Sequence, residues 1–308
     1  MDPAAIDQIT LNFNKQTLLV LNGIIGLMMF GMALDIKLED FKRVIRSPKA
    51  PAIGLVAQFI LLPALTYVLT LIINPAPSIA LGMILVSACP GGNLSNIITY
   101  LARGNAAVSV SMTAVSTAAA VFMTPANLAL WGSLNPATAP ILRQVSLSPF
   151  DVFLTIFMIL GIPLALGLTV SHLWPKLVER IRGPFKIFAI IVFCCFVAGA
   201  LGANWRIFLE VIGLIVFAVF IHNTLALSLG YCSGRLAGLE TRDVRAVAVE
   251  VGIQNSALAL VLIFDFFNGL GGMAIIAGWW GIWHIIAGLT LAFFWSRRPP
   301  NQVQEGKE

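Results

Sequence analysis

The sequence predicts an all-α polytopic membrane protein. Of the 308 residues, 58% are hydrophobic and only 11% are charged, whereas about 25% of the residues of a soluble domain are charged. No charged residue lies between Lys49 and Arg103, between Arg103 and Arg143, or between Asp265 and Arg297. Apolar runs of about 20 residues are long enough to cross the hydrocarbon core of a bilayer as helices. Most of this chain must therefore face lipid or its own interior.

Nine membrane spans are expected when the apolar runs are cut at charged clusters and at turns rich in Pro, Gly and Asn. Three of the turns are Asn74-Pro-Ala-Pro-Ser78, Asn135-Pro-Ala-Thr-Ala-Pro140 and Asn268-Gly-Leu-Gly-Gly272. We expect all the spans to belong to one membrane domain over residues 1–308. They cover residues 17–35, 50–73, 78–103, 105–132, 150–172, 185–203, 206–232, 242–267 and 270–296.

The basic residues predict the orientation of these spans, because connections on the cytoplasmic side carry an excess of Lys and Arg. With the N-terminus outside, 16 of the 19 basic residues fall on the cytoplasmic side, and Lys15, Arg143 and Arg206 fall outside. We therefore expect an outside N-terminus and a cytoplasmic C-terminus. The net charge of +5 reflects this distribution and does not indicate a nucleic-acid partner. The cytoplasmic set is Lys37, Lys42, Arg43, Arg46, Lys49, Arg103, Lys176, Arg180, Arg182, Lys186, Arg235, Arg242, Arg245, Arg297, Arg298 and Lys307.

The start of the chain lacks the pattern of a signal peptide. The first 16 residues are polar and hold a single basic residue, Lys15, whereas a signal peptide begins with a basic segment. We expect the first apolar run to be kept as a helix.

Two of the expected spans contain sequences that interrupt a helix. The third holds Cys89-Pro-Gly-Gly-Asn-Leu-Ser-Asn96, and the eighth holds Glu250-Val-Gly-Ile-Gln-Asn-Ser256. Pro, paired Gly and small polar residues disfavour a continuous helix. At membrane depth, backbone freed from helical bonding is tolerated only where protein or a water-filled cavity satisfies it. Interrupted helices at matching places in two halves indicate a transporter binding site built from inverted repeats.

The surroundings of the two interrupted spans also match. The span before each one carries a polar residue among apolar neighbours, Gln58 in one half and His222-Asn223 in the other. One further span follows each interrupted span. The first half then has four spans and the second has five, so we expect inverted repeats of which one lacks its first helix.

Glu250 is the residue that most directly indicates chemistry. A carboxylate at membrane depth is costly and marks a functional site by default; the alternative is a protonated glutamic acid that joins two helices. Oxygen ligands suit hard cations, and one carboxylate among neutral oxygens suits a monovalent one. The pattern offers no cluster of His, Cys or several acids that would suit zinc or calcium. Neutral oxygens are supplied by Asn93, Ser95, Asn96, Ser109, Thr113, Ser116, Gln254, Asn255 and Ser256.

Three of these residues, Ser109, Thr113 and Ser116, form a hydroxyl stripe along one face of the fourth span. Taken alone, the stripe has an alternative interpretation, because Ser and Thr often join transmembrane helices by hydrogen bonds.

These motifs together resemble the bile acid:sodium symporter family, over nearly the whole chain and in the same order. The matching elements are Gln58, the run at 89–104, Ser-Val-Ser-Met-Thr-Ala-Val-Ser-Thr at 109–117, His222-Asn223, the run at 250–256 and Trp283-His284. The resemblance implies a sodium-coupled symporter of an organic anion in the inner (plasma) membrane of a bacterium. Bile acids, sulfated steroids, pantoate and similar small carboxylates are the substrates that it offers.

The resemblance also implies a fold and a set of site residues. A panel domain would hold the helices at about 17–35, 150–172 and 185–203. A core domain would hold residues 50–132 and 206–296, with the two broken helices crossing at its centre. Two sodium ions are implied, and substrate would lie near Asn93, Asn255 and His284. One sodium site would use Ser95, Asn96, Ser109, Thr113 and Glu250; the other would use Gln58, Glu250, Gln254 and the carbonyls of Val251 and Ile253.

Three departures from the family pattern stand out. One helix fewer is expected than in bacterial members. Asn93-Leu94 replaces the more usual Thr-Ala, which changes the lining of the substrate pocket and leaves the coupling ion unaffected. Ile253 stands where methionine is common, a change of little effect if only its carbonyl is used.

Other function classes fit the sequence less well. A hydrolase triad of Ser95, Asp265 and His284 lacks a nucleophile-elbow motif, and Gly91-Gly92 lacks the Gly-Lys-Ser/Thr of a phosphate loop, so we expect no enzymatic activity. Nothing resembles the selectivity filter of a channel. The alternative that stays open is a proton-coupled transporter of organic anions with Glu250 as the proton carrier.

Overall fold

The computed structural model describes residues 23, 26–27, 30–31, 33–92, 94–145, 149–203, 205–298 and 300. Helices account for nearly all of this part of the chain, and it contains no β-strand; one isolated backbone bridge pairs Gly91 with Gln254. The predicted all-α class is therefore confirmed. Most of the expected first span and Asn93 lie outside the described residues.

The first half of the chain consists of a short amphipathic helix, long helices and one interrupted helix. The short helix α3 carries basic residues at Lys42, Arg43 and Arg46. The elements are α3 (Leu38–Arg46), α4 (Lys49–Val56), a π-helical turn η1 (Ala57–Leu61), α5 (Leu62–Ile73), α6 (Pro77–Ala88), α7 (Leu94–Leu101), α8 (Ala106–Leu134) and α9 (Ala139–Val145).

The second half repeats the pattern of a long helix with a π-helical turn and, later, an interrupted helix. Its elements are α10 (Pro149–Ile156), η2 (Phe157–Gly161), α11 (Ile162–Leu173), α12 (Pro175–Ala203), α13 (Trp205–Leu236), α14 (Thr241–Gly252), α15 (Ser256–Phe266) and α16 (Gly271–Ser296).

The expected span boundaries agree closely with these helices, with two differences. The helix expected at 185–203 starts at Pro175, because Pro175 occupies the first helical position, where no N–H is needed, and Pro184 is accommodated inside the helix. Residues 139–145 form a short helix, α9, where a turn was expected through Pro140. Neither difference changes the order of the long apolar segments.

Five of the described helices are long and apolar enough to cross a membrane. They are Lys49–Ile73, Ala106–Leu134, Phe153–Leu173, Gly213–Leu236 and Gly271–Ser296. The interrupted segments contribute shorter apolar helices, Pro77–Ala88 and Ser256–Phe266. Several helices are thus candidates for membrane spans, in agreement with the predicted class.

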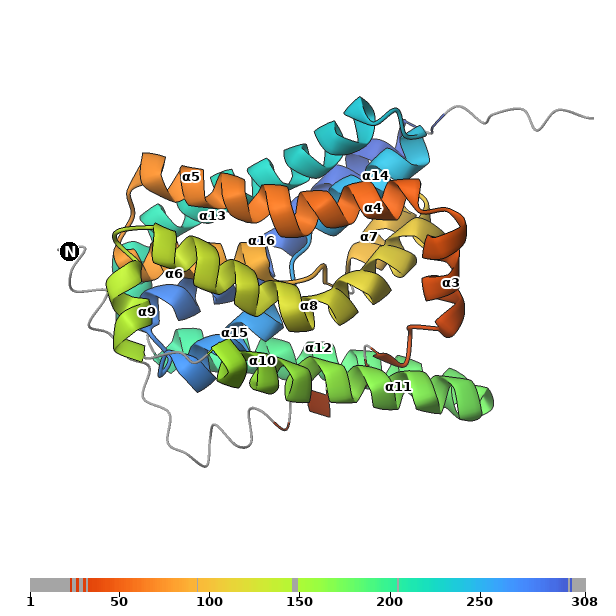
Figure 1. Ribbon diagram of the computed structural model, residues 1–308, viewed down its shortest axis with the longest axis horizontal. Coiled ribbons are helices and arrows are strands. Elements are labelled where there is room, and N and C mark those ends of the chain that lie inside the picture. The colour runs from red at the N-terminus through yellow and green to blue at the C-terminus, as the bar shows by residue number, and fades with distance from the viewer. Residues whose placement is uncertain are drawn as a thin grey trace, which may run out of the picture.

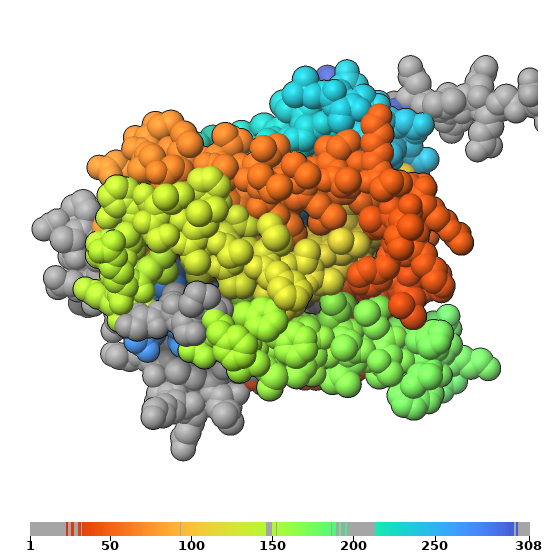
Figure 2. Space-filling view, in the orientation of Figure 1, coloured from red at the N-terminus to blue at the C-terminus, as the bar shows by residue number. Residues whose placement is uncertain are grey.

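The helices lie side by side in layers (Figure 1). Helices α4 and α5 lie along the upper edge of Figure 1 with α13 and α14, and α10 and α11 lie along the lower edge in front of α12. Figure 2 shows this order on the surface, where α8 separates the orange α4–α5 from the green α10–α11. Helix α6 is central, and every residue from Ser78 to Ala88 is buried. A helix that is apolar all round belongs in such a core.

The connections rich in basic residues share one end of the molecule. Helix α3, the end of α11 and the start of α14 lie at the right of Figure 1, and α9 lies at the left. Helix α9 carries Arg143, one of the three basic residues expected on the opposite side. The basic connections named here therefore lie at the end of the molecule opposite to Arg143; the side of the membrane on which each end lies stays a prediction.

Candidate functional site

The two interrupted helices meet at their breaks. The N–H of Gly92 donates to the carbonyl oxygen of Ile253 at 2.7 Å, and the N–H of Asn255 donates to the carbonyl oxygen of Pro90 at 2.9 Å. Backbone groups that the breaks release from helical bonding thus satisfy one another, as burial in an apolar environment demands. The two predicted interruptions are therefore real and form one structural unit.

Local sequence explains where each break falls. Cys89 ends α6 with extended backbone, φ −76° and ψ 157°, and Pro90 follows without an N–H to continue the helix. Ile253 ends α14 with φ −108° and ψ 98°. Helix α15 then restarts because the side chain of Asn255 accepts a hydrogen bond from the N–H of Leu258 at 3.1 Å, which caps one orphan donor of the new helix.

Glycine is required where the two breaks touch. A Cβ atom on Gly92 would lie 3.0 Å from the carbonyl oxygen of Gln254, and one on Gly91 would overlap the carboxylate of Glu250. Gly91 and Gly92 therefore let the first break approach both the second break and the buried acid.

Neighbouring helices hold the ends of α6 and α14 through side-chain donors. The amide nitrogen of Gln58 donates to the carbonyl oxygen of Cys89 at 2.8 Å, and that of Asn223 donates to the carbonyl oxygen of Gly252 at 2.7 Å. The hydroxyl of Thr124 donates to the carbonyl oxygen of Ala88 at 2.7 Å. These donors satisfy carbonyls that a helix end would otherwise leave unpaired.

The carboxylate of Glu250 is buried among hydroxyl groups. Its side chain is 1% exposed. One carboxylate oxygen accepts hydrogen bonds from Ser95 at 2.5 Å and from Ser109 at 3.1 Å, and the other accepts from Thr113 at 2.7 Å. In the described part of the chain, no basic side chain forms an ion pair with this carboxylate. Glu250 is thus solvated by neutral oxygen groups rather than by a basic side chain.

Two of the hydroxyl groups around Glu250, those of Ser109 and Thr113, each have more than one acceptor within reach. The side-chain oxygen of Asn96 lies 2.8 Å from the hydroxyl of Ser109 and 3.2 Å from that of Thr113. Thr113 also lies 3.0 Å from the carbonyl oxygen of Ser109. Each hydroxyl carries one hydrogen, so Ser95, Ser109 and Thr113 together can give one hydrogen to each carboxylate oxygen and to the Asn96 oxygen. A buried cluster of a carboxylate, hydroxyls and an amide oxygen fits a hard cation, which binds through oxygen ligands.

A second group of oxygens lies beside the break in α14 and α15. The amide nitrogen of Gln58 also lies 2.8 Å from the side-chain oxygen of Gln254, and the amide nitrogen of Gln254 donates to the carbonyl oxygen of Val251 at 2.7 Å. The carbonyl oxygen of Ile253 accepts from Gly92. The amide oxygen of Gln58 is buried and has no hydrogen-bond partner in the described part of the chain. It is therefore an available ligand atom.

The structure brings both expected groups of oxygens to the crossing, but the carboxylate of Glu250 is hydrogen-bonded to the first group. Gly91 packs against this carboxylate and pairs with Gln254. Gly91 thus lies between the carboxylate of Glu250 and Gln254, a residue of the second group.

The expected substrate residues are placed in part. Asn255 is 5% exposed and caps α15. His284 is 4% exposed on α16, and its Nδ1 atom has no hydrogen-bond partner among the described residues. One turn further along α16, Gly288 contacts Ile98 and Ile253, so this helix runs beside both interrupted segments. Asn93 lies outside the described residues.

Sequence reasoning missed the contacts of two buried polar residues in helices that carry the site. Thr124 precedes Pro125 inside α8, and a hydroxyl next to a helix-interior proline was the only signal for it. Arg245, counted with the cytoplasmic connections, lies within α14 and is 5% exposed. Asn223 was noticed as polar among apolar residues, but its contact with Gly252 depends on the packing of α13 against α14.

Two interrupted helices that cross in the interior, with a buried carboxylate beside the crossing, are features of secondary transporters. The helix breaks supply free backbone groups for ligands, and the buried oxygens supply a place for a cation. These features define the class of the protein as a membrane transporter.

Comparison with known proteins gives the family. Residues 23–211 match the model of the Sodium Bile acid symporter family. The uncharacterized sodium-dependent transporter YocS of Bacillus subtilis is 32% identical over 275 residues, which cover 89% of this chain and 82% of YocS. The ileal sodium/bile acid cotransporter of Homo sapiens is 31% identical over 262 residues, which cover 82% of this chain and 72% of that protein.

A plant protein is also similar. The probable sodium/metabolite cotransporter BASS1 of Arabidopsis thaliana is 30% identical over 282 residues, which cover 90% of this chain and 67% of BASS1. The chain belongs to the sodium bile acid symporter family, a family of sodium-dependent membrane transporters, and it is not an enzyme. The predicted family is confirmed.

Proposed function

We propose that this protein is a secondary active transporter that couples the entry of sodium to symport of an organic anion by alternating access. The observation that carries the proposal is the position of Glu250, a buried carboxylate at the crossing with three hydroxyl groups and an amide oxygen around it. A proton carrier needs no such shell of oxygens. A sodium ion does, because it exchanges its water for protein oxygens.

Two sodium ions are proposed as transported cargo. The first would bind to Ser95, Asn96, Ser109, Thr113 and Glu250. The second would bind to Gln58, Gln254, Glu250 and the carbonyls of Val251 and Ile253. The buried amide oxygen of Gln58 and the cluster of buried oxygens around Glu250 support these two assignments. Because each site includes residues from different helices, sodium would fix the broken segments relative to one another.

The organic anion would bind next to the sodium ions. Helices α7 and α15 both begin at the crossing, and helix N-termini present free N–H groups and a positive dipole to anions. Sodium at Glu250 would make this region more positive and strengthen anion binding; the anion must then strengthen sodium binding by the same factor. The proposed contacts are Asn93, Asn255 and His284, and the proposed substrate is a bile acid, pantoate or a similar carboxylate.

The finer architecture is part of the proposal. Nine spans would form inverted repeats of four and five helices. The panel would contain the helices at about 17–35, 150–172 and 185–203, and the core would contain residues 50–132 and 206–296. The position of α10, α11 and α12 along one edge supports this division. The protein would lie in a bacterial inner membrane with the N-terminus outside, since the basic connections share one end of the molecule.

Thermal unfolding of the detergent-purified protein tests the proposal. A ligand that binds only the folded state stabilises it by RT ln(1 + [L]/Kd), about 2.7 kcal/mol at a hundredfold excess over Kd. We expect sodium, but not potassium or choline, to raise the unfolding temperature of the wild type, and Glu250→Ala to remove the effect. If pH alone shifts the unfolding temperature and Glu250→Ala removes that shift, the protein is proton-coupled instead.

A further inference from the structure

Arg245 occupies a buried position at the start of α14 without a carboxylate partner in the described part of the chain. Its guanidinium donates to the carbonyl oxygens of Ala102 at 2.8 Å, Trp295 at 3.2 Å and Arg298 at 2.5 Å. It also lies 5.5 Å from the centroid of the Trp295 ring. The charge is therefore satisfied by main-chain carbonyls and an aromatic face.

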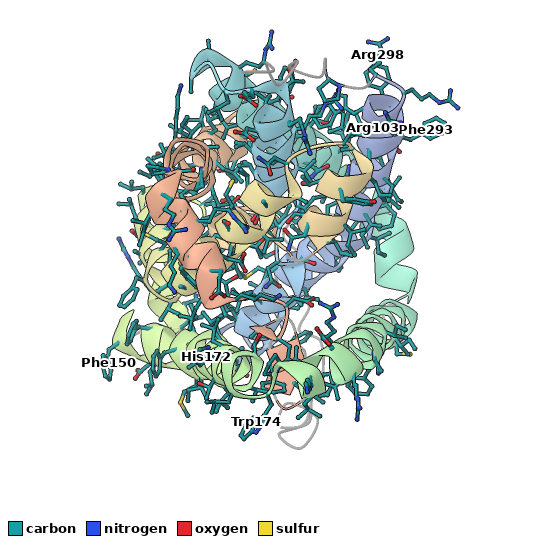
Figure 3. All side chains as sticks on the ribbon, turned by 90° about the vertical axis from the view of Figure 1, so that its right-hand side faces the viewer. Arg103, Phe150, His172, Trp174, Phe293 and Arg298 are labelled. Atoms are coloured by element: carbon teal, nitrogen blue, oxygen red, sulfur yellow. The ribbon has the colours of Figure 1, made fainter. Side chains whose placement is uncertain are left out.

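These carbonyls belong to two helix ends. Ala102 follows the last residue of α7, Trp295 lies in the last turn of α16, and Arg298 follows that helix. The last carbonyls of a helix have no partner within it and carry the negative end of the helix dipole. A guanidinium has five N–H donors in a planar fork, so one arginine can cap both ends at once. Figure 3 labels Arg103 and Arg298 at the upper right of the view, at the end of the molecule where these helix ends lie.

A second contact joins the same end of α14 to the connection between α7 and α8. The N–H of Asn105 donates to the carbonyl oxygen of Arg242 at 2.9 Å, and its side-chain amide donates to the carboxylate of Asp243 at 2.8 Å. The first turns of α14 are thus attached to α7, to the start of α8 and to the end of α16.

This attachment bears on the geometry of the carboxylate. Arg245 lies five residues before Glu250 on α14, about 7.5 Å along the helix axis at 1.5 Å per residue. Ala102 lies seven residues after Ser95, a residue of α7. At the helical rise of 1.5 Å per residue, this is about 10.5 Å along the helix axis. Helices α7 and α14 are therefore joined at two points, one at Arg245 and Ala102 and one at Glu250 and Ser95. Two points of attachment prevent one helix from sliding along the other.

We propose that Arg245 is a positioning residue for sodium binding: it holds α14 at the height, relative to α7 and α16, at which the carboxylate of Glu250 meets Ser95, Ser109 and Thr113. The inference rests on the proposed function. It concerns a residue that contacts no proposed ion ligand and acts through the helix that carries Glu250.

The direction of the change in sodium affinity distinguishes a positioning role of Arg245 from a direct electrostatic effect of its charge. A cation about 7.5 Å along the helix from Glu250 repels sodium, so removal of its charge alone should tighten sodium binding. Loss of the positioning of α14 should instead weaken sodium binding. A purely structural role would lower the unfolding temperature in choline and leave the sodium Kd unchanged.

The experiment is a sodium titration of the unfolding temperature for wild type, Arg245→Gln and Arg245→Lys, with Arg297→Gln as the control. The control removes a charge at the same end whose guanidinium lies 4.1 Å from the Phe293 ring centroid. We expect Arg245→Gln to raise the sodium Kd about tenfold, equivalent to 1.4 kcal/mol. Arg245→Lys should give an intermediate Kd, because an ammonium is compact and lacks the planar fork. Arg297→Gln should match the wild type.

An unchanged or lower sodium Kd in Arg245→Gln would overturn the inference. If Arg245→Gln does not fold, Arg245→Lys decides: a raised Kd supports positioning through the carbonyls, and a wild-type Kd contradicts it. Failure of the proposed function is distinguishable, because the wild type itself would then show no sodium-dependent shift.

Discussion

The break between α6 and α7 and the break between α14 and α15 are two solutions to the same structural problem. At each one, an amide side chain from the helix that precedes the interrupted pair donates to a carbonyl at the end of the first half-helix: Gln58 to Cys89, and Asn223 to Gly252. Both amides also have a buried oxygen without a hydrogen-bond partner in the described part of the chain. The two regions thus share a scaffold.

The breaks differ in how the sequence produces them. Pro90 and the Gly91-Gly92 pair interrupt the first helix through local backbone chemistry. The second break contains no proline. The side chain of Asn255 caps α15, and the side chain of Asn223 donates a hydrogen bond to the last residue of α14. Backbone hydrogen bonds also join this break to Pro90 and Gly92. Proline and glycine encode the first break locally, whereas the second break relies more on contacts with other parts of the folded protein.

The breaks also differ in charge at equivalent positions. Glu250 lies three residues before Ile253, the C-cap of α14, and Val86 lies three residues before Cys89, the C-cap of α6. Val86 is fully buried and Glu250 is 1% exposed. Only one of the two matched half-helices therefore carries a charge at this depth. In the proposed function, α14 is therefore the half-helix that binds sodium, and α6 is its apolar counterpart.

The largest expected effect tests this difference in charge. Glu250→Gln keeps the shape of the side chain and removes its charge, so the sodium-dependent stabilisation of about 2.7 kcal/mol at a hundredfold excess over Kd should be lost. Val86→Ile, at the matched apolar position, should leave the sodium response intact. The measurement is the unfolding temperature in sodium and in choline. A full sodium response in Glu250→Gln would show that the charge on α14 is not needed for sodium binding.

The hydrogen bonds that the side chains of Gln58 and Asn223 donate provide a second test, with a smaller expected effect on sodium binding. Asn223→Ala leaves the carbonyl of Gly252 buried without its donor, which should cost about 1–3 kcal/mol of stability in choline and in sodium alike. Gln58→Ala should cost a similar amount and, in addition, raise the sodium Kd, because its amide oxygen is a proposed ligand. Equal sodium affinities in the two variants would contradict the assignment of Gln58 to a sodium site.

The smallest effects concern the breaks themselves. Asn255→Ala removes the cap of α15 and should cost about 1 kcal/mol. Pro90→Ala should cost less, because Gly91-Gly92 and the pairing with the second break still keep α6 from continuing. Denaturation of both variants in choline compares them without the contribution of sodium. A larger loss in Pro90→Ala would show that the first break depends on proline alone.

The sequence by itself predicted the all-α membrane class and the two breaks, which the structure confirms, and it indicated Glu250 as a functional residue, which stays a prediction. Each of these predictions rests on a local pattern. The apolar runs predict the class, the Pro, Gly and small polar residues predict the breaks, and a carboxylate inside an apolar run indicates Glu250. The resemblance to the family then supplied both groups of oxygen ligands, and the structure brings their described members to the crossing. Their role as sodium ligands stays a prediction.

Tertiary structure alone decided which groups meet. Ser95 and Glu250 are 155 residues apart in the chain yet hydrogen-bonded, and neither residue type identifies its partner. The same holds for Thr124 with Ala88 and for Asn223 with Gly252. Arg245 is the clearest case: the sequence counts it among the basic residues on the cytoplasmic side, and only the packing of α14 against α7 and α16 brings three carbonyls within its reach. Hydrogen bonds between distant segments depend on distances that no local pattern contains.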